Sequence, residues 1–387
     1  MRILFVSTTS ATAQAFLLPI AKYERERGHD VSFACSFQSY ADAPSKLKDL
    51  HEAGFIVHEI PFAREIHPLR DARAFWSLIR LIQMNQYDLV HTYTSKAGFV
   101  GRFAAKFARC PNIMHTVLGF AFQEYNSGLK RQFYILLEKI AAPFCDFMLF
   151  ISDFNRNEAI RYRLKPESTL VPVGLSFDSI DKFKNFQVNT TAVQPQYKDQ
   201  PNELLVGTVG RLVYQKGMDT FIKAAALVLK KRSDVRFIIA GDGALRAELE
   251  ELARSLGIAD RVQFLGFLTE MENVMSLMSS LDLFVLSTRF EGLGLVYLEA
   301  MSLRCPVVGS KIPPITEVVK DGETGILATV DDPEDFARAI LVLLENPELR
   351  KRMGAAGPAH VEREFSVQQV LERIDNVYQK IEAASLQ

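Results

Sequence analysis

Cysteine is scarce in this sequence, and the few that occur form no recognisable pattern. The 387 residues include four, Cys35, Cys110, Cys145 and Cys305. They make no C-x-x-C pair and no even ladder of spacings, so neither a disulfide framework nor a zinc site is indicated. A reducing, cytosolic compartment fits these thiols best.

Long apolar runs are lacking as well. No stretch of about 20 uninterrupted apolar residues occurs, which argues against a membrane-spanning helix. The first apolar run, residues 3–6, breaks at Ser7 and is too short for the core of a signal peptide, so we expect a first strand there. The expected location is the cytoplasm, and a peripheral position on the inner face of the cytoplasmic membrane stays open.

Neither sign of charge dominates. The formal net charge of −1 argues against a dedicated nucleic-acid binder, because such a domain carries a clear excess of Lys and Arg. The balance is uneven along the chain: residues 1–175 hold 21 Lys and Arg against 16 Asp and Glu, whereas the remaining residues hold 24 against 30. The first half is therefore the one expected to meet an anionic partner.

What the sequence does contain is the alternation typical of α/β proteins. Hydrophobic residues make up 48% and charged residues 24%, as in soluble globular domains. Short runs rich in Val, Ile and Phe alternate with helical patterns along residues 3–172 and again along residues 204–309. This alternation predicts parallel sheets with crossover helices.

The predicted architecture is therefore two Rossmann-like, doubly wound domains that face a central cleft. Their expected bounds are 1–180 and 204–365, with a polar linker at 181–203. A last helix within residues 366–387 is expected to pack back on the first domain. A break in the helical pattern is expected before it, at the sequence G-A-A-G-P of residues 354–358.

The strongest local signal is the segment FEGLGLVYLEA at 290–300, which follows an apolar run. Its two glycines allow the backbone to approach a ligand closely, and a helix starting near Leu295 would aim free N–H groups at an anion. Glu291 then lies in the loop and Glu299 inside the helix, so one carboxylate is placed to bind a sugar hydroxyl and the other a ribose. A capped surface helix with ordinary glutamates is the alternative.

A second signal is the segment GRLVYQKG at 210–217, again between a strand and a helix. Arg211 and Lys216 supply two cations suited to a diphosphate, the Arg through its planar fork and the Lys as a point charge. A cation at a helix N-terminus is unfavourable by roughly a few tenths of a kcal/mol, so Lys216 needs an anion nearby. A solvated lysine on a loop is the alternative.

Together these segments resemble the donor half of glycosyltransferase family 4, the retaining nucleotide-sugar transferases of the GT-B fold, and the resemblance covers nearly the whole chain. In that family the G-R-x(n)-K-G element binds the donor diphosphate, and the E-x7-E element binds the donor sugar and ribose. The resemblance implies catalytic roles for Arg211, Lys216 and Glu291 and a nucleobase contact for Leu268. The donor-binding residues that it implies are Gly210, Arg211, Lys216, Leu268, Glu291, Gly292, Leu293, Gly294, Leu295 and Glu299.

The same resemblance implies that the sugar is transferred with retention at the anomeric carbon. It also implies that the reaction needs no metal or other cofactor. UDP is the family's most common donor nucleotide, and no residue pattern in this sequence distinguishes a UDP-sugar donor from a GDP-sugar donor. The acidic cluster DDPED at 331–335 is predicted to begin a helix, with Pro in the first turn, rather than to bind a metal.

Two further segments, HTYTSKAG at 91–98 and FLLPI at 16–20, resemble more narrowly the bacterial branch that builds lipid-linked capsule, exopolysaccharide and O-antigen chains. This implies a lipid-linked saccharide as the acceptor. The acceptor-side candidates are Thr94, Ser95, Lys96, His115 and Gly119. The chain departs from the family at Leu118, where a His commonly contacts the donor sugar. As a lone histidine near a strand end, His115 is also compatible with a structural role.

Basic and aromatic residues are concentrated in the first domain. Residues 61–140 hold 11 Lys and Arg against 5 Asp and Glu. The helical pattern at 73–84 is apolar on most faces but includes Arg73 and Arg80, which suits a helix lying on an anionic membrane. A core helix with a solvated basic rim is the alternative, and both stay open.

Rival functions share parts of this pattern. A nicotinamide-dependent dehydrogenase is suggested by Gly241-x-Gly243, but the third glycine is missing and Arg261 stands where an acid should bind the ribose. A nucleotide-sugar 2-epimerase shares the fold, but additional acid/base carboxylates are not identifiable. A catalytically impaired scaffold protein is favoured by Leu118, whereas the presence of all four charged motif residues argues against it.

Overall fold

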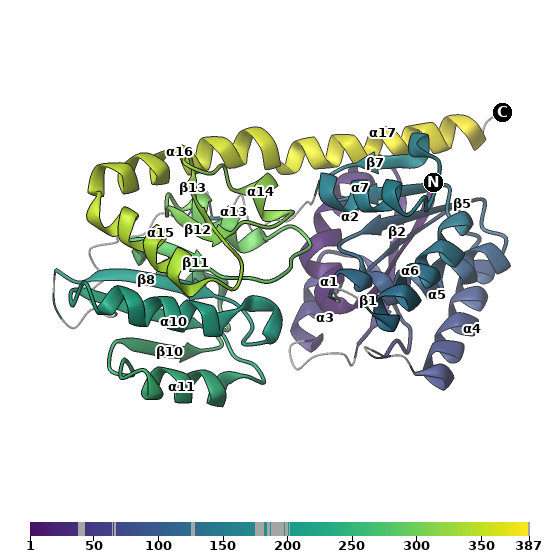
Figure 1. The fold of residues 1–387 in the computed structure, drawn as a ribbon. Coiled ribbons are helices and arrows are strands. Elements are labelled where there is room, and N and C mark those ends of the chain that lie inside the picture. The colour runs from purple at the N-terminus through teal and green to yellow at the C-terminus, as the bar shows by residue number, and fades with distance from the viewer. Residues whose placement is uncertain are drawn as a thin grey trace. The chain divides into compact units, whose positions relative to one another are not determined.

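The structure is a computed structural model, and it describes residues 1–37, 43–63, 65, 67–124, 128–174, 182, 183, 186, 197, 200 and 202–385. The chain divides into two compact units, one of Met1–Asp178 with Phe365–Gln387 and one of Ser179–Glu364 (Figure 1). Most of the predicted linker lies outside the described residues.

The N-terminal unit is built on a seven-stranded parallel sheet with the strand order β3-β2-β1-β4-β5-β6-β7. Its strands are β1 (Arg2–Thr9), β2 (Asp30–Ser36), β3 (Ile56–Glu59), β4 (Leu89–Tyr93), β5 (Asn112–Val117), β6 (Phe147–Phe150) and β7 (Leu170–Pro172). The central strands β1 and β4 are buried along almost their whole length, because helices cover both faces of such a sheet. The strand order reverses between β1 and β4, which is where ligands of doubly wound sheets bind.

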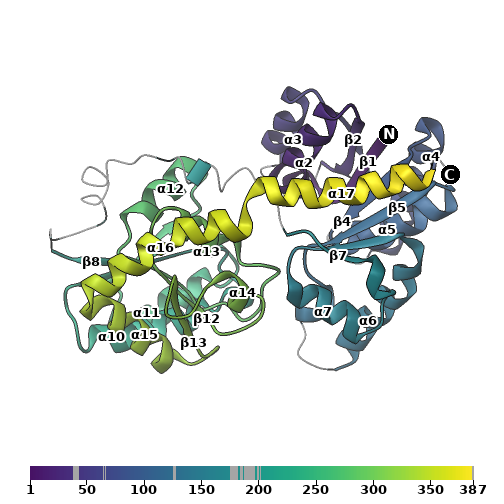
Figure 2. The same cartoon turned by 90° about the horizontal axis from the view of Figure 1, so that it is seen from above.

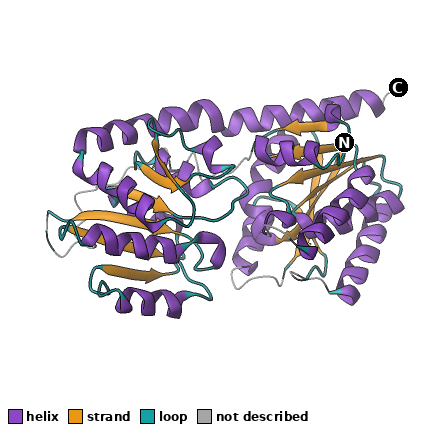
Figure 3. Cartoon of the chain, in the orientation of Figure 1, coloured by secondary structure: helices purple, strands orange, loops and turns teal. Residues whose placement is uncertain are grey.

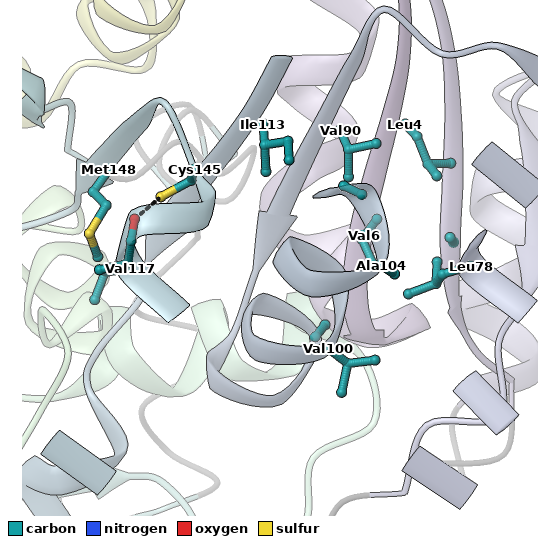
Figure 4. Packing of buried hydrophobic residues seen from close by; sticks show 14 of the residues in the cluster. Leu4, Val6, Leu78, Val90, Val100, Ala104, Ile113, Val117, Cys145 and Met148 are labelled. Carbon is teal, nitrogen blue, oxygen red and sulfur yellow. Dashed lines mark hydrogen bonds between the residues drawn. The ribbon is translucent and has the colours of Figure 1, made fainter. Parts of the chain in front are cut away.

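Two layers of helices cover this sheet. The helical segments are α1 (Ser10–Thr12), η1 (Ala13–Leu17), α2 (Leu18–Glu26), α3 (Ala43–Glu52), α4 (Pro68–Asn85), α5 (Ser95–Phe107), η2 (Ala121–Glu124), α6 (Leu129–Ala141), η3 (Ala142–Phe144), α7 (Asp153–Arg161) and η4 (Glu167–Thr169). Helices α4, α5 and α6 pack over one face, where Val100 and Ala104 of α5 share a buried cluster with Val6 and Val90 (Figure 4). Residues of η1 and α2 belong to a second cluster on the opposite face.

Helix α17 (Val367–Ser385) packs on this second face of the N-terminal unit (Figure 2). Ile374 and Tyr378, four residues apart on one side of the helix, are buried in the same cluster as Phe5 of β1. Tyr378 Oη lies 2.7 Å from Nδ1 of the buried His91 in β4. The last helix is thus part of the core of the first unit.

The C-terminal unit contains a six-stranded parallel sheet with the order β10-β9-β8-β11-β12-β13. Figure 3 shows the strands of both units in orange and the helices in purple. Its strands are β8 (Leu204–Val209), β9 (Val235–Ala240), β10 (Val262–Gly266), β11 (Leu283–Leu286), β12 (Val307–Ser310) and β13 (Gly325–Ala328). Its helical segments are η6 (Tyr214–Lys216), α10 (Met218–Leu229), α11 (Arg246–Ser255), α12 (Met271–Ser280), α13 (Leu295–Ser302), α14 (Ile315–Val318), α15 (Pro333–Glu345) and α16 (Pro347–Phe365). Both units are therefore parallel α/β sheets, as the alternation of apolar runs predicted.

The predicted break before the last helix is wrong. Gly354, Gly357 and Pro358 lie inside α16. A Cβ at position 354 would lie 2.3 Å from the carbonyl oxygen of Arg304, and one at position 357 would lie 2.6 Å from that of Met301. The two glycines therefore let α16 pack directly against backbone at the end of α13, whereas the sequence pattern suggested that they interrupt a helix.

A helix that crosses a membrane needs about 20 predominantly apolar residues. Among the described helices, none combines the length and the apolar composition that such a crossing requires. The long helices α4, α16 and α17 each carry several charged residues.

Candidate active site

The two motif segments of the C-terminal unit lie side by side where its strand order reverses. Residues 210–217 follow β8 and residues 287–294 follow β11, and these two strands are neighbours in the sheet. Because the strands are parallel, both segments leave the sheet at the same edge. The topology therefore brings the cations of the first segment to the acid of the second.

Lys216 and Glu291 form an ion pair at this edge. Lys216 Nζ lies 2.5 Å from Glu291 Oε1, and both side chains are largely buried. The hydroxyl of Thr288 lies 3.1 Å from the same carboxylate oxygen. The lysine that precedes α10 thus has the anion that its position requires. The pair places a cation beside a hydrogen-bond acceptor, an arrangement suited to a phosphorylated sugar.

Hydrogen bonds join the two segments along their backbones. Ser287 Oγ donates to the carbonyl of Gly217 at 2.6 Å, and Gln215 Nε2 donates to the carbonyl of Phe290 at 2.9 Å. Gly217 has a φ of +60°, and a Cβ there would lie 2.0 Å from the carbonyl oxygen of Ser287. Only glycine allows the segments to come this close.

The rest of the second segment forms the loop and first turn in front of α13. This part comprises Gly292, Leu293, Gly294 and Leu295. Gly294 has a φ of +92° and no side chain with which to cap the helix. This end of α13 therefore lacks the cap that Ser or Asp would give, and its N–H groups are oriented toward the loop.

The remaining donor-side candidates follow β8, follow β10 or lie in α13. Gly210 directly follows β8 and donates from its N–H to the carbonyl of Ala240 at 3.0 Å. Arg211 is exposed, and its Nη2 lies 3.4 Å from Gln215 Oε1. Leu268 is half-buried in the loop after β10, and Glu299 is half-buried within α13.

The acceptor-side candidates lie at the carboxyl ends of β4 and β5 in the N-terminal unit. Thr94, in front of α5, has a φ of 64°, and its hydroxyl lies 2.6 Å from that of Thr8 in β1. This contact marks the point where the strand order reverses. Ser95 begins α5, and Gly119 follows β5. Because Thr94 is not a glycine, its positive φ carries strain of about 1–3 kcal/mol.

Two acceptor-side candidates are engaged inside the unit. Lys96 Nζ pairs with Asp71 of α4 at 2.8 Å. His115 is 2% exposed, and its Nδ1 lies 3.0 Å from the hydroxyl of Thr92. Burial, followed by the charge of Arg102, lowers the pKa of His115 well below its usual value, so the ring is neutral. The structure places His115 in the core rather than at a ligand-facing surface.

The acidic cluster at 331–335 begins α15, as predicted. Asp332 Oδ1 accepts hydrogen bonds from the N–H groups of Glu334 and Asp335, each at 3.0 Å. Over the ranges that the structure describes, no three His, Cys, Asp or Glu residues are grouped so that they could hold a metal ion.

Sequence reasoning missed Arg289. Its side chain pairs with Asp219 at 3.0 Å and with Asp331 at 2.8 Å. Its guanidinium carbon lies 4.3 Å from the centre of the Tyr214 ring. The one available signal was an arginine two residues before Glu291, and nothing in the spacing of its partners identified them.

Two family models match the chain. Residues 190–360 match the model "Glycosyl transferases group 1", and residues 12–174 match the model "Glycosyl transferase 4-like domain". Each match therefore falls largely on one of the two parallel α/β units.

Named glycosyltransferases are among the similar proteins. The capsular polysaccharide biosynthesis glycosyltransferase CapM of Staphylococcus aureus is 27% identical over 84% of each chain. The UDP-Gal:alpha-D-GlcNAc-diphosphoundecaprenol alpha-1,3-galactosyltransferase of Escherichia coli is 28% identical over 74% of each chain. The structure of Anabaena HepE with UDP and glucose matches with a TM-score of 0.83 and 22% identity, and the match covers 98% of this chain and 100% of HepE. The chain belongs to the group 1, family-4-like glycosyltransferases of the GT-B fold, enzymes that transfer hexosyl groups.

Proposed function

We propose that this enzyme transfers a hexose from a UDP-sugar to a hydroxyl of a lipid-linked saccharide, with retention, during synthesis of a bacterial surface polysaccharide. The observation that carries the proposal is the pairing of Lys216 with Glu291 at the switch point of the C-terminal sheet. In the reaction the bond between the anomeric carbon and the diphosphate oxygen breaks. The acceptor oxygen bonds to that carbon on the same face, and its proton passes to the departing phosphate.

The donor half of the proposal rests on charge. The diphosphate gains negative charge as it departs, and fixed positive groups stabilise that charge. Lys216 would exchange Glu291 for a phosphate oxygen, which leaves the carboxylate of Glu291 to accept a hydrogen bond from the sugar. Arg211 is exposed and has a long contact with Gln215, so it is available to a second phosphate. These groups require no metal, and we propose none.

The names of related proteins support the choice of substrates. HepE was solved with UDP and glucose. The Escherichia coli relative is named for a UDP-galactose donor and for an acceptor carried on diphosphoundecaprenol. We extend to this chain the nucleotide and the kind of acceptor, and leave the sugar and the linkage open.

We also propose that the outer face of α4, α5 and α6 rests on an anionic membrane, where a lipid-linked acceptor would be found. The large apolar side chains that these helices expose are Leu69, Trp76, Met84, Phe107, Leu129, Phe133, Leu136 and Ile140. The last four recur every three or four residues and so form one stripe along α6. A stripe of this kind suits insertion at a lipid interface.

The charges of these helices support the same orientation. Their two acidic residues are paired from within the unit, Asp71 with Lys96 at 2.8 Å and Glu138 with Arg102 at 2.9 Å. The basic side chains that these helices expose include Arg70, Arg73, Arg80, Lys106 and Lys139. The outer face is therefore apolar with a basic rim, which is attracted to anionic lipid.

The transferase proposal is tested by release of nucleoside diphosphate from a panel of UDP- and GDP-sugars, with and without bacterial lipid extract. We expect release from one donor, stimulated by lipid and lost in Lys216→Ala and Glu299→Ala. Lys230→Ala is the matched control, because it removes an exposed lysine at the far end of α10. If no donor is turned over and neither UDP nor GDP binds, the proposal is wrong. That result would favour a catalytically impaired scaffold protein instead.

The membrane proposal is tested by co-sedimentation with vesicles of phosphatidylcholine alone and with added phosphatidylglycerol. We expect binding to the anionic vesicles only, and its loss in the double variant Phe133→Asp and Leu136→Asp. Leu256→Asp, which changes an exposed leucine of the C-terminal unit, should leave binding unchanged. Equal binding of the double variant and the wild type would contradict this orientation.

A further inference from the structure

We propose that Arg289 is a positioning residue for the transfer reaction, because it fixes the 210–217 segment and with it Lys216. The inference rests on the proposed function, which assigns the donor diphosphate to this segment. Arg289 itself lies two residues before Glu291, in the segment that follows β11.

Arg289 holds two consecutive peptide groups just ahead of Lys216. Its main-chain N–H donates to the carbonyl of Gln215 at 2.8 Å, and its Nη1 donates to the carbonyl of Tyr214 at 2.8 Å. The guanidinium also lies over the Tyr214 ring, with 4.3 Å between its carbon and the ring centre. One residue therefore restrains both the backbone and a side chain of the segment.

The other edge of the guanidinium is anchored to two carboxylates. Nη2 lies 3.0 Å from each oxygen of Asp219, in the first turn of α10, and Nε lies 2.8 Å from Asp331 Oδ1, just before α15. The Arg289 side chain is only 13% exposed. Burial, the largest single influence, raises the pKa of Asp219, but the charges and hydrogen bonds of Arg289 and Lys223 together lower it overall.

These contacts make Arg289 a cross-link between three elements: the Tyr214 turn, helix α10 and the loop before α15. A lysine side chain such as that of Lys216 has a flexible four-carbon stem, so its ammonium can be preorganised only if the backbone that carries it is fixed. Binding energy is then not spent on ordering the segment. We therefore expect Arg289 to affect donor affinity without contacting the donor.

The experiment compares Arg289→Ala and Arg289→Lys with Arg232→Ala. Arg232 is a matched control in the same unit, since it also pairs with an aspartate, Asp234, at 2.5 Å and donates to a carbonyl, that of Leu344, at 3.0 Å. Hydrogen exchange of the peptide covering residues 211–217 measures the order of the segment without any ligand. Calorimetric titration with UDP and with GDP measures the consequence for binding, with Lys216→Ala as a reference.

We expect both Arg289 variants to speed exchange in this peptide and to weaken binding of the nucleotide that the wild type prefers by about tenfold or more, the effect of losing charge-assisted hydrogen bonds. Arg232→Ala should do neither. Arg289→Lys should not rescue, because a single ammonium cannot bond a carbonyl and two carboxylates together. A Lys variant with wild-type affinity and fast exchange would show that Arg289 acts as a simple charge, and the inference would be wrong.

The two proposals fail in different ways. If the wild type binds UDP or GDP and Lys216→Ala does not, while Arg289→Ala binds normally or keeps slow exchange, the positioning role is wrong and the donor site stands. If the wild type binds neither nucleotide, the proposed function fails, and the role of Arg289 in donor binding fails with it.

Discussion

The replacement Glu24→Gln is expected to stabilise the N-terminal unit at neutral pH and to have little effect near pH 5. Glu24 of α2 is fully buried, and among the described residues neither of its carboxylate oxygens has a hydrogen-bond partner. The imidazole nitrogen Nε2 of His29 lies 3.5 Å from Oε2 of Glu24. Burial, followed by the negative charge of Asp375, raises the pKa of Glu24 to about 8; Arg27 lowers it and Glu382 raises it further.

The size of the effect follows from proton linkage. Between the ordinary pKa of 4.5 and the folded value of about 8, the folded chain holds a proton that the unfolded chain has lost. The free energy of unfolding therefore falls as the pH rises through this window, by about 1.4 kcal/mol per pH unit. At pH 7 the loss is about 3 kcal/mol, and at pH 5 it is less than about 1 kcal/mol. A glutamine stays neutral and avoids this loss.

The assay is urea unfolding followed by tryptophan fluorescence from pH 5 to 8.5. Trp76 is the one tryptophan of the sequence and lies in α4, so the signal reports on the N-terminal unit. Glu52→Gln at an exposed position on α3 is the control and should change stability by less than about 0.5 kcal/mol at any pH. A gain that is the same at pH 5 and pH 8, or a loss at pH 7, would refute the reasoning.

Three further predictions follow from buried groups. Gly217→Ala should weaken UDP binding about tenfold or more in a calorimetric titration, because φ is +60° and the new Cβ would lie 2.0 Å from a facing carbonyl; unchanged affinity would contradict the role of that close approach. Tyr378→Phe should lower the free energy of unfolding of the N-terminal unit by about 1 kcal/mol equally at pH 5 and pH 8, since burial lowers the pKa of His91, its partner, to about 3; a pH-dependent loss would argue otherwise. Burial raises the pKa of Cys35 to about 12 and that of Cys305 still higher. Neither of these two thiols should therefore react with a thiol reagent at pH 8 until urea unfolds the chain. Labelling of Cys35 or Cys305 in the native protein would be inconsistent with this burial.

The parts of the fold that could be predicted are those that depend on local pattern. Apolar runs such as residues 204–209 predict buried parallel strands, and the structure has β8 at Leu204–Val209. The need of Lys216 for an anion could also be predicted from its position at a helix start, whereas its pairing with Glu291 at 2.5 Å could not. Asp332 as a helix cap followed from its position before Pro333.

The parts that could not be predicted depend on what lies opposite a residue in space. His115 is buried because Gly98 of α5 leaves room for its ring: a Cβ there would lie 2.2 Å from it. The glycines of α16 are explained only by the backbone that faces them, that of Arg304 at Gly354 and that of Met301 at Gly357. Arg289 acquires its contacts from Asp219 and Asp331, which lie 70 and 42 positions away in the chain. No periodicity or spacing carries that information.

The two units place different chemistry at equivalent points of the same topology. Where the order reverses in the N-terminal sheet, between β1 and β4, the residues in contact are the hydroxyls of Thr8 and Thr94. Where it reverses in the C-terminal sheet, between β8 and β11, the contact joins the charged Lys216 and Glu291. A departing diphosphate requires fixed cations, whereas an acceptor hydroxyl requires only neutral hydrogen-bonding groups. The distribution of charge between the two switch points therefore supports the proposed division into a donor unit and an acceptor unit.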